Sequence, residues 1–307
     1  MDILSARFTV LLLLVLNAVC GTAQVSSVLR QTEQSLKQSF TAITSDQDDQ
    51  MRIGKSMNFQ TDLALALRLQ GSWNYPWDSL KNMAKMESPD GNFRIYNWNV
   101  PLSNGRNRYF CIIRFRNDQK NDSLLVLTDC SDSVNDPEHY IGDAGAWYGA
   151  LYYKIIPFEL KGGTKAYLLL GWDGINLEIS SKLIEVLTFD EPYHPRFGAY
   201  LFPDFKDGKQ TRIIFRFSSN TGMSLRYLSQ KIPGKAKWNA KKREFEQPGK
   251  TVLMIVCDHL VPLDPKLENQ YQFYVPSSEV ADGFIFEDSF WKFIPEFNAL
   301  NNDSKGK

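Results

Sequence analysis

The stretch YLLLGWDGINLEISSKLIEVLTF, residues 167–189, decides the fold class. It holds two apolar runs rich in Leu, Ile and Val, and each run has the length of an ordinary strand. The link between them contains Asp173-Gly174, a dipeptide that favours the tight turn of a β-hairpin. The stretch therefore predicts two antiparallel strands joined at Asp173-Gly174, with Trp172 packed over the sheet edge.

The same texture continues from Ser88 to the end of the apolar sequence. About a dozen short runs of Tyr, Phe, Ile, Val and Leu alternate with turn residues, and no helical stretch separates them. Asp-Gly recurs at 90–91, 207–208 and 282–283, but the spacing is irregular, so no repeat requires a propeller. We therefore predict a mainly β fold, a large antiparallel β sandwich or open barrel over residues 88–295, with a small β-propeller as the alternative.

The segment before this body, residues 24–87, has helical periodicity. Apolar residues at helical spacing predict a first helix: Val28, Leu36, Phe40 and Ile43. The acidic run 45–48 predicts the N-terminal cap of a second helix, which reaches Gly71. Pro76 opens a third short helical segment over 76–86. We expect these helices to pack as a cap on the β domain, and we expect residues 296–307 to form a disordered tail.

Residues 1–23 have the pattern of a signal peptide. FTVLLLLVLNAV is apolar for about a dozen residues, fewer than the roughly 20 needed to span a bilayer. Small residues Gly21 and Ala23 stand at the −3 and −1 positions of a cut before Gln24. We expect export to the periplasm or the extracellular space, with a mature chain that begins at Gln24 and has no transmembrane helix. The alternative is a lipid anchor at Cys20, although the preceding Val19 is larger than a lipid-attachment box requires.

Composition excludes a nucleic-acid binder and leaves three cysteines in the mature chain. Lys and Arg total 35, as do Asp and Glu, so the basic excess of a nucleic-acid binder is missing. In an oxidising compartment Cys111 and Cys130 are the best-placed pair for one disulfide. The alternative is that Cys111, Cys130 and Cys257 are all small buried hydrophobes.

Two places combine residue types that could support catalysis. TVLMIVCDHL ends in Asp258 and His259, and strand alternation places His259 on the same face as Cys257. Side chains two apart on a strand lie roughly 7 Å apart, too far for a direct hydrogen bond, so we interpret Cys257 as a buried structural thiol. FDEPYHPRFG supplies Asp190 and His194 in a Pro-rich turn. No nucleophile elbow, Walker loop or dinucleotide fingerprint accompanies these four candidates.

Metal ligands are also weakly represented. The stretches FDEPYH and SDSVNDPEHY group carboxylates with histidine, but neither matches a regular ligand loop such as the EF-hand. We predict no metal site and no cofactor.

The aromatic residues are a further resource for binding. Trp172 and Trp238 are the candidates for stacking on a sugar, although tryptophans more commonly fill and edge sheets. Trp238 belongs to a basic stretch, residues 231–250, which we expect to form a projecting hairpin with the link NAKK. The hairpin is either a solvated loop or a finger for an anionic surface.

Several motifs resemble a group of exported bacterial β-rich proteins without an assigned activity. They are LGWDG, FDEPYHPRFG, the run from TRIIFRFS to MSLRY, CDHLVPLDP and FYVPSSEVADGFIFEDSFWKF. The resemblance implies export and a β fold and transfers no catalytic residue. We hypothesise a non-catalytic binding or envelope-associated protein with a glycan or an envelope protein as partner. The alternatives are a hydrolase of envelope or extracellular polymer, which uses carboxylates with His259 or His194, and a lipid-anchored assembly component.

Overall fold

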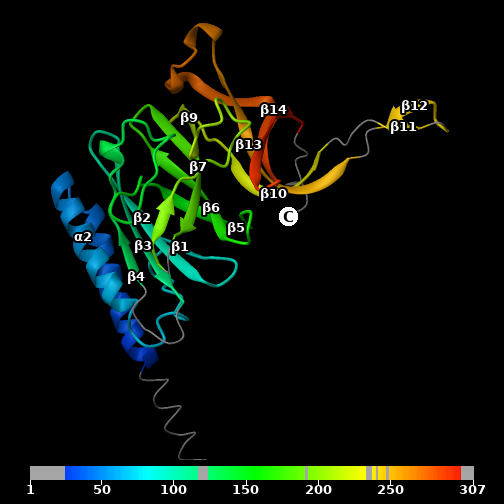
Figure 1. The fold of residues 1–307 in the computed structure, drawn as a ribbon. Coiled ribbons are helices and arrows are strands. Elements are labelled where there is room, and N and C mark those ends of the chain that lie inside the picture. Colours follow the sequence, from blue (N-terminus) through cyan, green and yellow to red (C-terminus); the bar gives the residue numbers. More distant parts are fainter. Residues whose placement is uncertain are drawn as a thin grey trace, which may run out of the picture.

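The computed structural model describes residues 25–116, 124–190, 193–232, 237–239, 241–246 and 249–298. Strands hold 45% of the chain and helices 18%, which makes the fold mainly β. Figure 1 shows the N-terminal helices along one side of antiparallel sheets that do not close into a barrel. The predicted sandwich with a helical front is therefore confirmed. The predicted signal peptide and most of the predicted tail lie outside the described residues.

Two helices form the outer layer. The first covers residues 25–44 and the second, α2, spans Asp49–Ala66. Asp48 caps α2, because its carboxylate accepts a hydrogen bond of 2.8 Å from the Met51 amide, as the acidic run predicted. Phe59 and Leu63 of α2 are fully buried and pack against the first sheet together with Trp98.

The third predicted helix is wrong. Residues 76–83 form turns, and the following residues form strand β1, Ala84–Glu87. β1 pairs with the next strand along its whole length, with Lys85 opposite Tyr96 and Glu87 opposite Arg94. Pairing with an existing sheet edge therefore overrides the weak helical preference of a short segment that begins with proline.

The first sheet lies directly under the helices. Its strands follow the order β1, β2 (Phe93–Pro101), β3 (Asn107–Phe115) and β4 (Leu124–Leu127), and all pairs are antiparallel. Even-numbered side chains such as Tyr96 and Trp98 face the helices, whereas Phe93 and Ile95 face the second sheet. Both faces of this sheet are thus covered.

The second sheet is the central layer. It contains β5 (Leu151–Glu159), β6 (Lys165–Gly174), β7 (Ile179–Phe189) and β8 (Pro195–Phe197), and β9 (Arg212–Ser218) also pairs with β7. Along β6, Leu169 packs towards the first sheet and Leu168 and Leu170 pack towards the third. Burial on both faces explains why residues 167–172 are continuously apolar rather than alternating.

The third sheet closes the stack. Its order is β10 (Leu225–Ile232), β13 (Lys250–Pro262), β14 (Tyr274–Glu287) and β15 (Phe290–Phe297). Ile255, Cys257 and Phe284 bury its inner face against β6, β7 and β9. Short 3-10 helices cover Ser131–Ser133, Pro265–Leu267 and Tyr271–Phe273.

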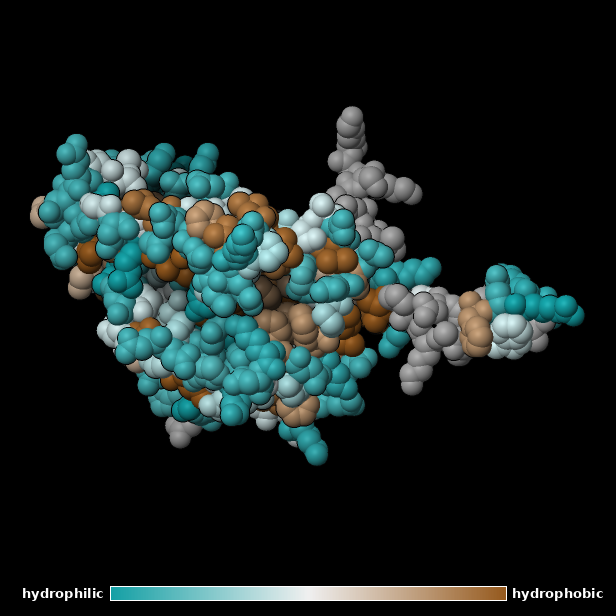
Figure 2. All heavy atoms as spheres, turned by 90° about the horizontal axis from the view of Figure 1, so that it is seen from above, coloured by the Kyte–Doolittle hydropathy of each residue, from teal (hydrophilic) through white to brown (hydrophobic). Residues whose placement is uncertain are grey.

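The basic stretch contains a small separate hairpin. Strands β11 (Lys237–Asn239) and β12 (Glu244–Glu246) pair with each other, as the sequence predicted, and Figure 1 shows them apart from the sheets. The rings of Trp238 and Phe245 lie 5.1 Å apart and are largely exposed. Figure 2 shows this projecting hairpin from above as mostly hydrophilic, with a small apolar area on one side.

Two of the four Asp-Gly pairs are not turns. Gly91 and Gly208 have φ values of 72°, as turn glycines do, and both lie in turns. In contrast, Asp173-Gly174 continues β6 opposite Ser181 and Ser180, and 282–283 lies at a bulge within β14. The prediction of a turn at 173–174 is therefore wrong, and the link is residues 175–178. Gly174 is needed for close packing, because a Cβ there would lie 2.4 Å from the Asn107 Nδ2.

The three cysteines among the described residues are free thiols. Cys111 lies in the core between the first two sheets, and Cys257 lies between the second and third. The Cys130 Sγ is 3.5 Å from the Tyr140 hydroxyl. The disulfide between Cys111 and Cys130 is therefore not formed, and burial instead raises the pKa of both Cys111 and Cys257.

Candidate functional site

The long connection between β4 and β5, residues 128–150, folds back over one end of the first two sheets. Its two ends run side by side, because the Trp147 amide bonds to Thr128 O at 2.9 Å and the Cys130 amide bonds to Trp147 O at 2.8 Å. Its middle is joined to β8 by two bonds of 2.9 Å between Gly142 and Phe197. We call residues 131–148 the site loop.

A buried polar network holds the site loop against the second sheet. Arg212 and Glu185 are both 0% exposed, and the Arg212 Nε donates to the Glu185 carboxylate at 2.7 Å. Arg212 also donates to the carbonyl of Pro137 in the site loop. On the other side of the carboxylate, the Tyr152 hydroxyl donates to Glu185, and the Trp147 indole N–H donates to Tyr152 at 2.8 Å. Arg212 is therefore paired and Glu185 has a second donor, as a buried ion pair requires.

A polar cleft lies between the site loop and the ends of β3, β6 and β9. Its cavity volume is about 180 Å³. The polar side chains that line it are Arg106, Asn107, Ser131, Asp132, Tyr148, Asp173 and Arg216. They come from segments far apart in the sequence, so the cleft exists only when the site loop is docked.

Asp173 forms the floor of the cleft and is only 6% exposed. Its two carboxylate oxygens accept hydrogen bonds from the Tyr109 hydroxyl at 2.8 Å and from the Tyr148 hydroxyl at 2.9 Å. Burial raises the pKa of Asp173, and the two tyrosine hydroxyls oppose that shift. Burial and the nearby carboxylate raise the pKa of both tyrosines, so both act as hydrogen-bond donors at neutral pH.

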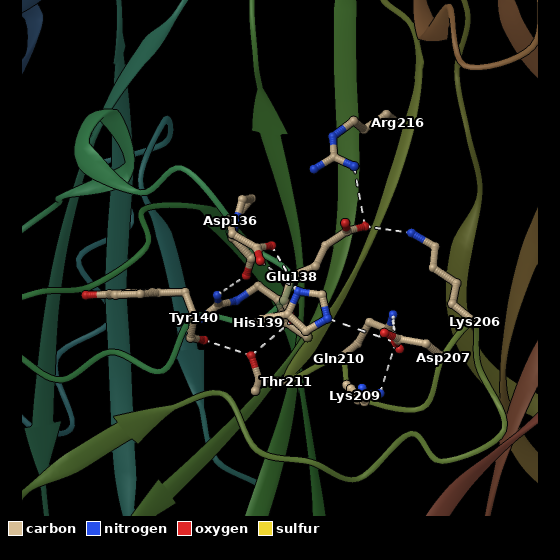
Figure 3. Close-up of polar contacts among 12 residues, drawn as sticks. Asp136, Glu138, His139, Tyr140, Lys206, Asp207, Lys209, Gln210, Thr211 and Arg216 are labelled. Carbon is tan, nitrogen blue, oxygen red and sulfur yellow. Dashed lines mark hydrogen bonds and ion pairs between the residues drawn. The ribbon is translucent and has the colours of Figure 1, made fainter.

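The charged groups around the cleft are paired with each other. On one wall, the Arg106 guanidinium lies 2.5 Å from the Asp132 carboxylate. On the other, Glu138 of the site loop lies 2.7 Å from the Lys206 Nζ and 3.4 Å from the Arg216 Nη1. Figure 3 shows Glu138 between these two cations. The cleft therefore offers donors and acceptors in a fixed arrangement with little excess charge.

His139 lies beside the cleft in the same loop. Its Nδ1 is 3.0 Å from the Asp136 carboxylate, and its Nε2 faces Asp207 at 4.0 Å (Figure 3). The hydrogen bond to Asp136 raises the pKa of His139, and Asp207 and Glu138 add to that shift. Below it, the Thr211 hydroxyl donates to Tyr140 O at 2.8 Å, which joins the loop to the start of β9.

The four catalytic candidates from the sequence are distributed over two sheets. His259 of β13 bonds to Asp282 of β14 through its Nδ1 at 2.9 Å, whereas Asp258 accepts from the Ser224 amide at 2.7 Å. Asp190 follows β7 and pairs with Arg196 at 3.2 Å, and His194 is exposed in the turn before β8. The structure therefore does not bring the pair from β13 and the pair after β7 into one site.

The two tryptophan candidates also lie apart. Trp172 is half-buried on β6, and its ring lies close to Gly174, which lines the cleft. Trp238 is 55% exposed on the separate hairpin. The residues that sequence reasoning missed are Asp173 and the tyrosines that hold it. The sequence does contain one indication of this site, because Asp173 is a lone carboxylate at the end of a continuously apolar strand.

Comparison with known protein families, curated proteins and solved structures finds no match. Among the described residues, no helix has both the length and the apolar character needed to cross a bilayer. Within the same part of the chain, no group of three or more His, Cys, Asp or Glu side chains is arranged to hold a metal ion. The acidic site loop illustrates the reason, because Asp132 and Glu138 are turned towards arginine and lysine partners.

We predict that His139 titrates above its ordinary value of 6.5 and that Asp136→Asn moves the midpoint back towards that value. A raised folded-state pKa means that the pair stabilises the fold below the unfolded pKa and that this contribution is lost as pH rises through the folded pKa. Imidazole chemical shifts followed by NMR against pH give the midpoint. Asp190→Asn is the control and should leave it unchanged; an unchanged midpoint in Asp136→Asn contradicts the assignment.

Proposed function

We propose that the protein is an exported, non-catalytic binding protein whose cleft above Asp173 binds a saccharide. The observation that carries the proposal is the fixed mixture of donors and acceptors around Asp173. Each hydroxyl of a sugar both donates and accepts a hydrogen bond, so it is best matched by carboxylate, amide and guanidinium groups close together. Asp173, Asn107 and Arg106 supply one of each.

The size and charge of the cleft support the same ligand class. A volume of about 180 Å³ corresponds to about six waters at roughly 30 Å³ each, which is the scale of a single sugar residue. The arginines at the walls are already paired with Asp132 and Glu138, so an anionic ligand would have to compete with resident carboxylates. A neutral, hydroxyl-rich ligand does not need to displace these carboxylates, because the five N–H donors of a guanidinium allow Arg106 to bind Asp132 and a sugar hydroxyl together.

The Asp173 environment favours binding over catalysis. Both carboxylate oxygens accept tyrosine hydrogen bonds, which fix the group and favour its ionised form. Glycoside hydrolysis is the second candidate, because Asp132 also lines the cleft and burial acts to raise the pKa of Asp173, as a general acid requires. In that case Asp173 would donate a proton, and its bonds to Tyr109 and Tyr148 would have to be exchanged.

We predict that Asp173→Asn weakens saccharide binding at least tenfold, because it removes the negative charge that strengthens hydrogen bonds donated by the ligand hydroxyls. Glycan-array binding, followed by calorimetric titration of each sugar that binds, measures the effect. Asp288→Asn, which changes an exposed carboxylate in the β14–β15 turn, is the matched control. No binding of wild-type protein to any glycan contradicts the proposal. Cleavage of a bound glycan by wild type but not by Asp173→Asn would identify the hydrolase instead.

Export is supported by the N-terminal sequence, in which a short apolar run precedes small residues at the cleavage positions. We predict that the intact mass of protein recovered from a bacterial host corresponds to a chain that begins at Gln24. Ala23→Arg places a large charged residue at the −1 position and should prevent cleavage, so the recovered protein should have the mass of the uncleaved precursor. A measured mass that corresponds to a chain beginning at Cys20 with attached acyl chains would contradict the soluble product and support the lipid-anchored alternative.

A further inference from the structure

A second cavity lies on the other side of the first sheet from the Asp173 cleft. The segment between α2 and β1, residues 72–80, crosses the helix-facing side of β1 and β2 and encloses about 220 Å³. The polar side chains at this cavity are Tyr75, Trp77, Lys85, Glu87, Arg94 and Tyr96. The strand register places them together, since Lys85 is opposite Tyr96 and Glu87 is opposite Arg94.

Two donors at this cavity are buried without an acceptor. Trp77 and Tyr96 are each 1% exposed. The indole N–H of Trp77 has no hydrogen-bond partner among the described residues, and the hydroxyl of Tyr96 faces only the donors Arg94 and Arg114, so its proton has no acceptor there. A buried donor without an acceptor destabilises the fold, so two at one cavity require an explanation. Because both side chains line the cavity, an acceptor bound in it would satisfy both donors.

Cations surround the same two donors. The Arg94 Nε donates to Glu87 at 2.9 Å, and the Lys85 Nζ donates to Trp77 O at 2.7 Å. Arg114 stands beside Arg94 across the β2–β3 pair, and its Nη1 is also buried without a partner among the described residues. The guanidinium groups of Arg94 and Arg114 lie 4.6 and 5.3 Å from the centre of the Trp73 ring, which fixes them above the sheet.

The carboxylates that act on these cations are Glu87, Glu33 and Asp78. Glu87 is engaged by Arg94, and Glu33 is held by the Tyr75 hydroxyl at 2.6 Å and by the Ser79 amide at 2.7 Å. Burial lowers the pKa of Lys85 and of Arg114, against the opposing effects of Asp78 and Glu33 on Lys85 and of Tyr96 on Arg114. Burial raises the pKa of Tyr96, against the effect of Arg94 and Arg114, so its hydroxyl remains a donor at neutral pH.

The backbone at Trp77 adds a second indication of a specific site. Trp77 has a φ of 56°, in the left-handed region that non-glycine residues adopt rarely and at a cost. The indole is buried at the cavity, with its ring edge against Tyr75 at 4.9 Å between centroids. Backbone strain of this kind is found preferentially where a side chain must be held in place for binding.

We propose that this cavity binds a small oxyanion, a phosphate or sulfate group, through the Tyr96 hydroxyl and the Trp77 indole N–H, with Lys85 and Arg94 as the countercharges. Tetrahedral oxyanions have several acceptor oxygens and therefore satisfy both donors at once. The group is either a free inorganic ion or the charged part of a larger ligand, since the cavity is partly open to solvent at Lys85 and Glu87.

The test is calorimetric titration of the full mature chain with inorganic phosphate, inorganic sulfate and a monosaccharide phosphate. Tyr96→Phe is expected to weaken binding about tenfold or more, because it removes one hydrogen bond to a charged acceptor. The same substitution removes an unsatisfied buried hydroxyl, so the melting temperature without anion should not fall. Tyr200→Phe, which changes an exposed tyrosine outside the cavity, is the control, and anion affinity should be retained.

Binding of inorganic phosphate or sulfate with this pattern of variants supports a site for the free ion. Binding of the monosaccharide phosphate alone, with the same loss in Tyr96→Phe, supports a site for the charged part of a larger ligand. The proposal is overturned if wild-type protein binds none of the three at millimolar concentration. It is equally overturned if Tyr96→Phe binds as tightly as wild type.

Discussion

The buried ion pair between Arg212 and Glu185 is the interaction on which the site depends. Both side chains are fully buried in the second sheet, and removal of one partner of such a pair costs about 3–5 kcal/mol, because the other charge is left uncompensated. Arg212 also donates to Pro137 O, and Tyr152 donates to Glu185 and accepts from the Trp147 indole N–H, so the pair is connected to the site loop at Pro137 and at Trp147. A purely apolar core at this place would pack the sheet but would not specify where the loop lies.

The position of the loop determines what the cleft can do. Tyr148 comes from the loop and Tyr109 from the first sheet, and together they hold Asp173 of the second sheet. A saccharide can therefore bind there only when these three segments are packed together. The proposed oxyanion cavity, by contrast, depends on the first sheet and the segment before β1 and contains no residue of the site loop. The two proposals therefore stand on different parts of the fold and are independent of each other.

Much of the fold was predictable from local sequence, whereas the site was not. Apolar runs and the Asp48 cap are local signals, so the layers and α2 follow from them. The Asp173-Gly174 dipeptide has the same local chemistry as a turn, but tyrosines 25 and 64 residues away bind its carboxylate and keep the pair inside β6. The free thiols of Cys111 and Cys130 likewise depend on sheet geometry. Contacts between distant segments decide these points, and a single sequence does not display them.

Amide hydrogen exchange in Glu185→Gln tests most directly whether the buried pair positions the site loop. The substitution keeps the shape of the side chain but leaves Arg212 without its counterion. We expect exchange in residues 131–148 to become at least tenfold faster than in wild type, whereas β2 and β3 keep their protection. Unchanged exchange in residues 131–148 would contradict the account, because the loop would then be held by contacts other than the Arg212–Glu185 network.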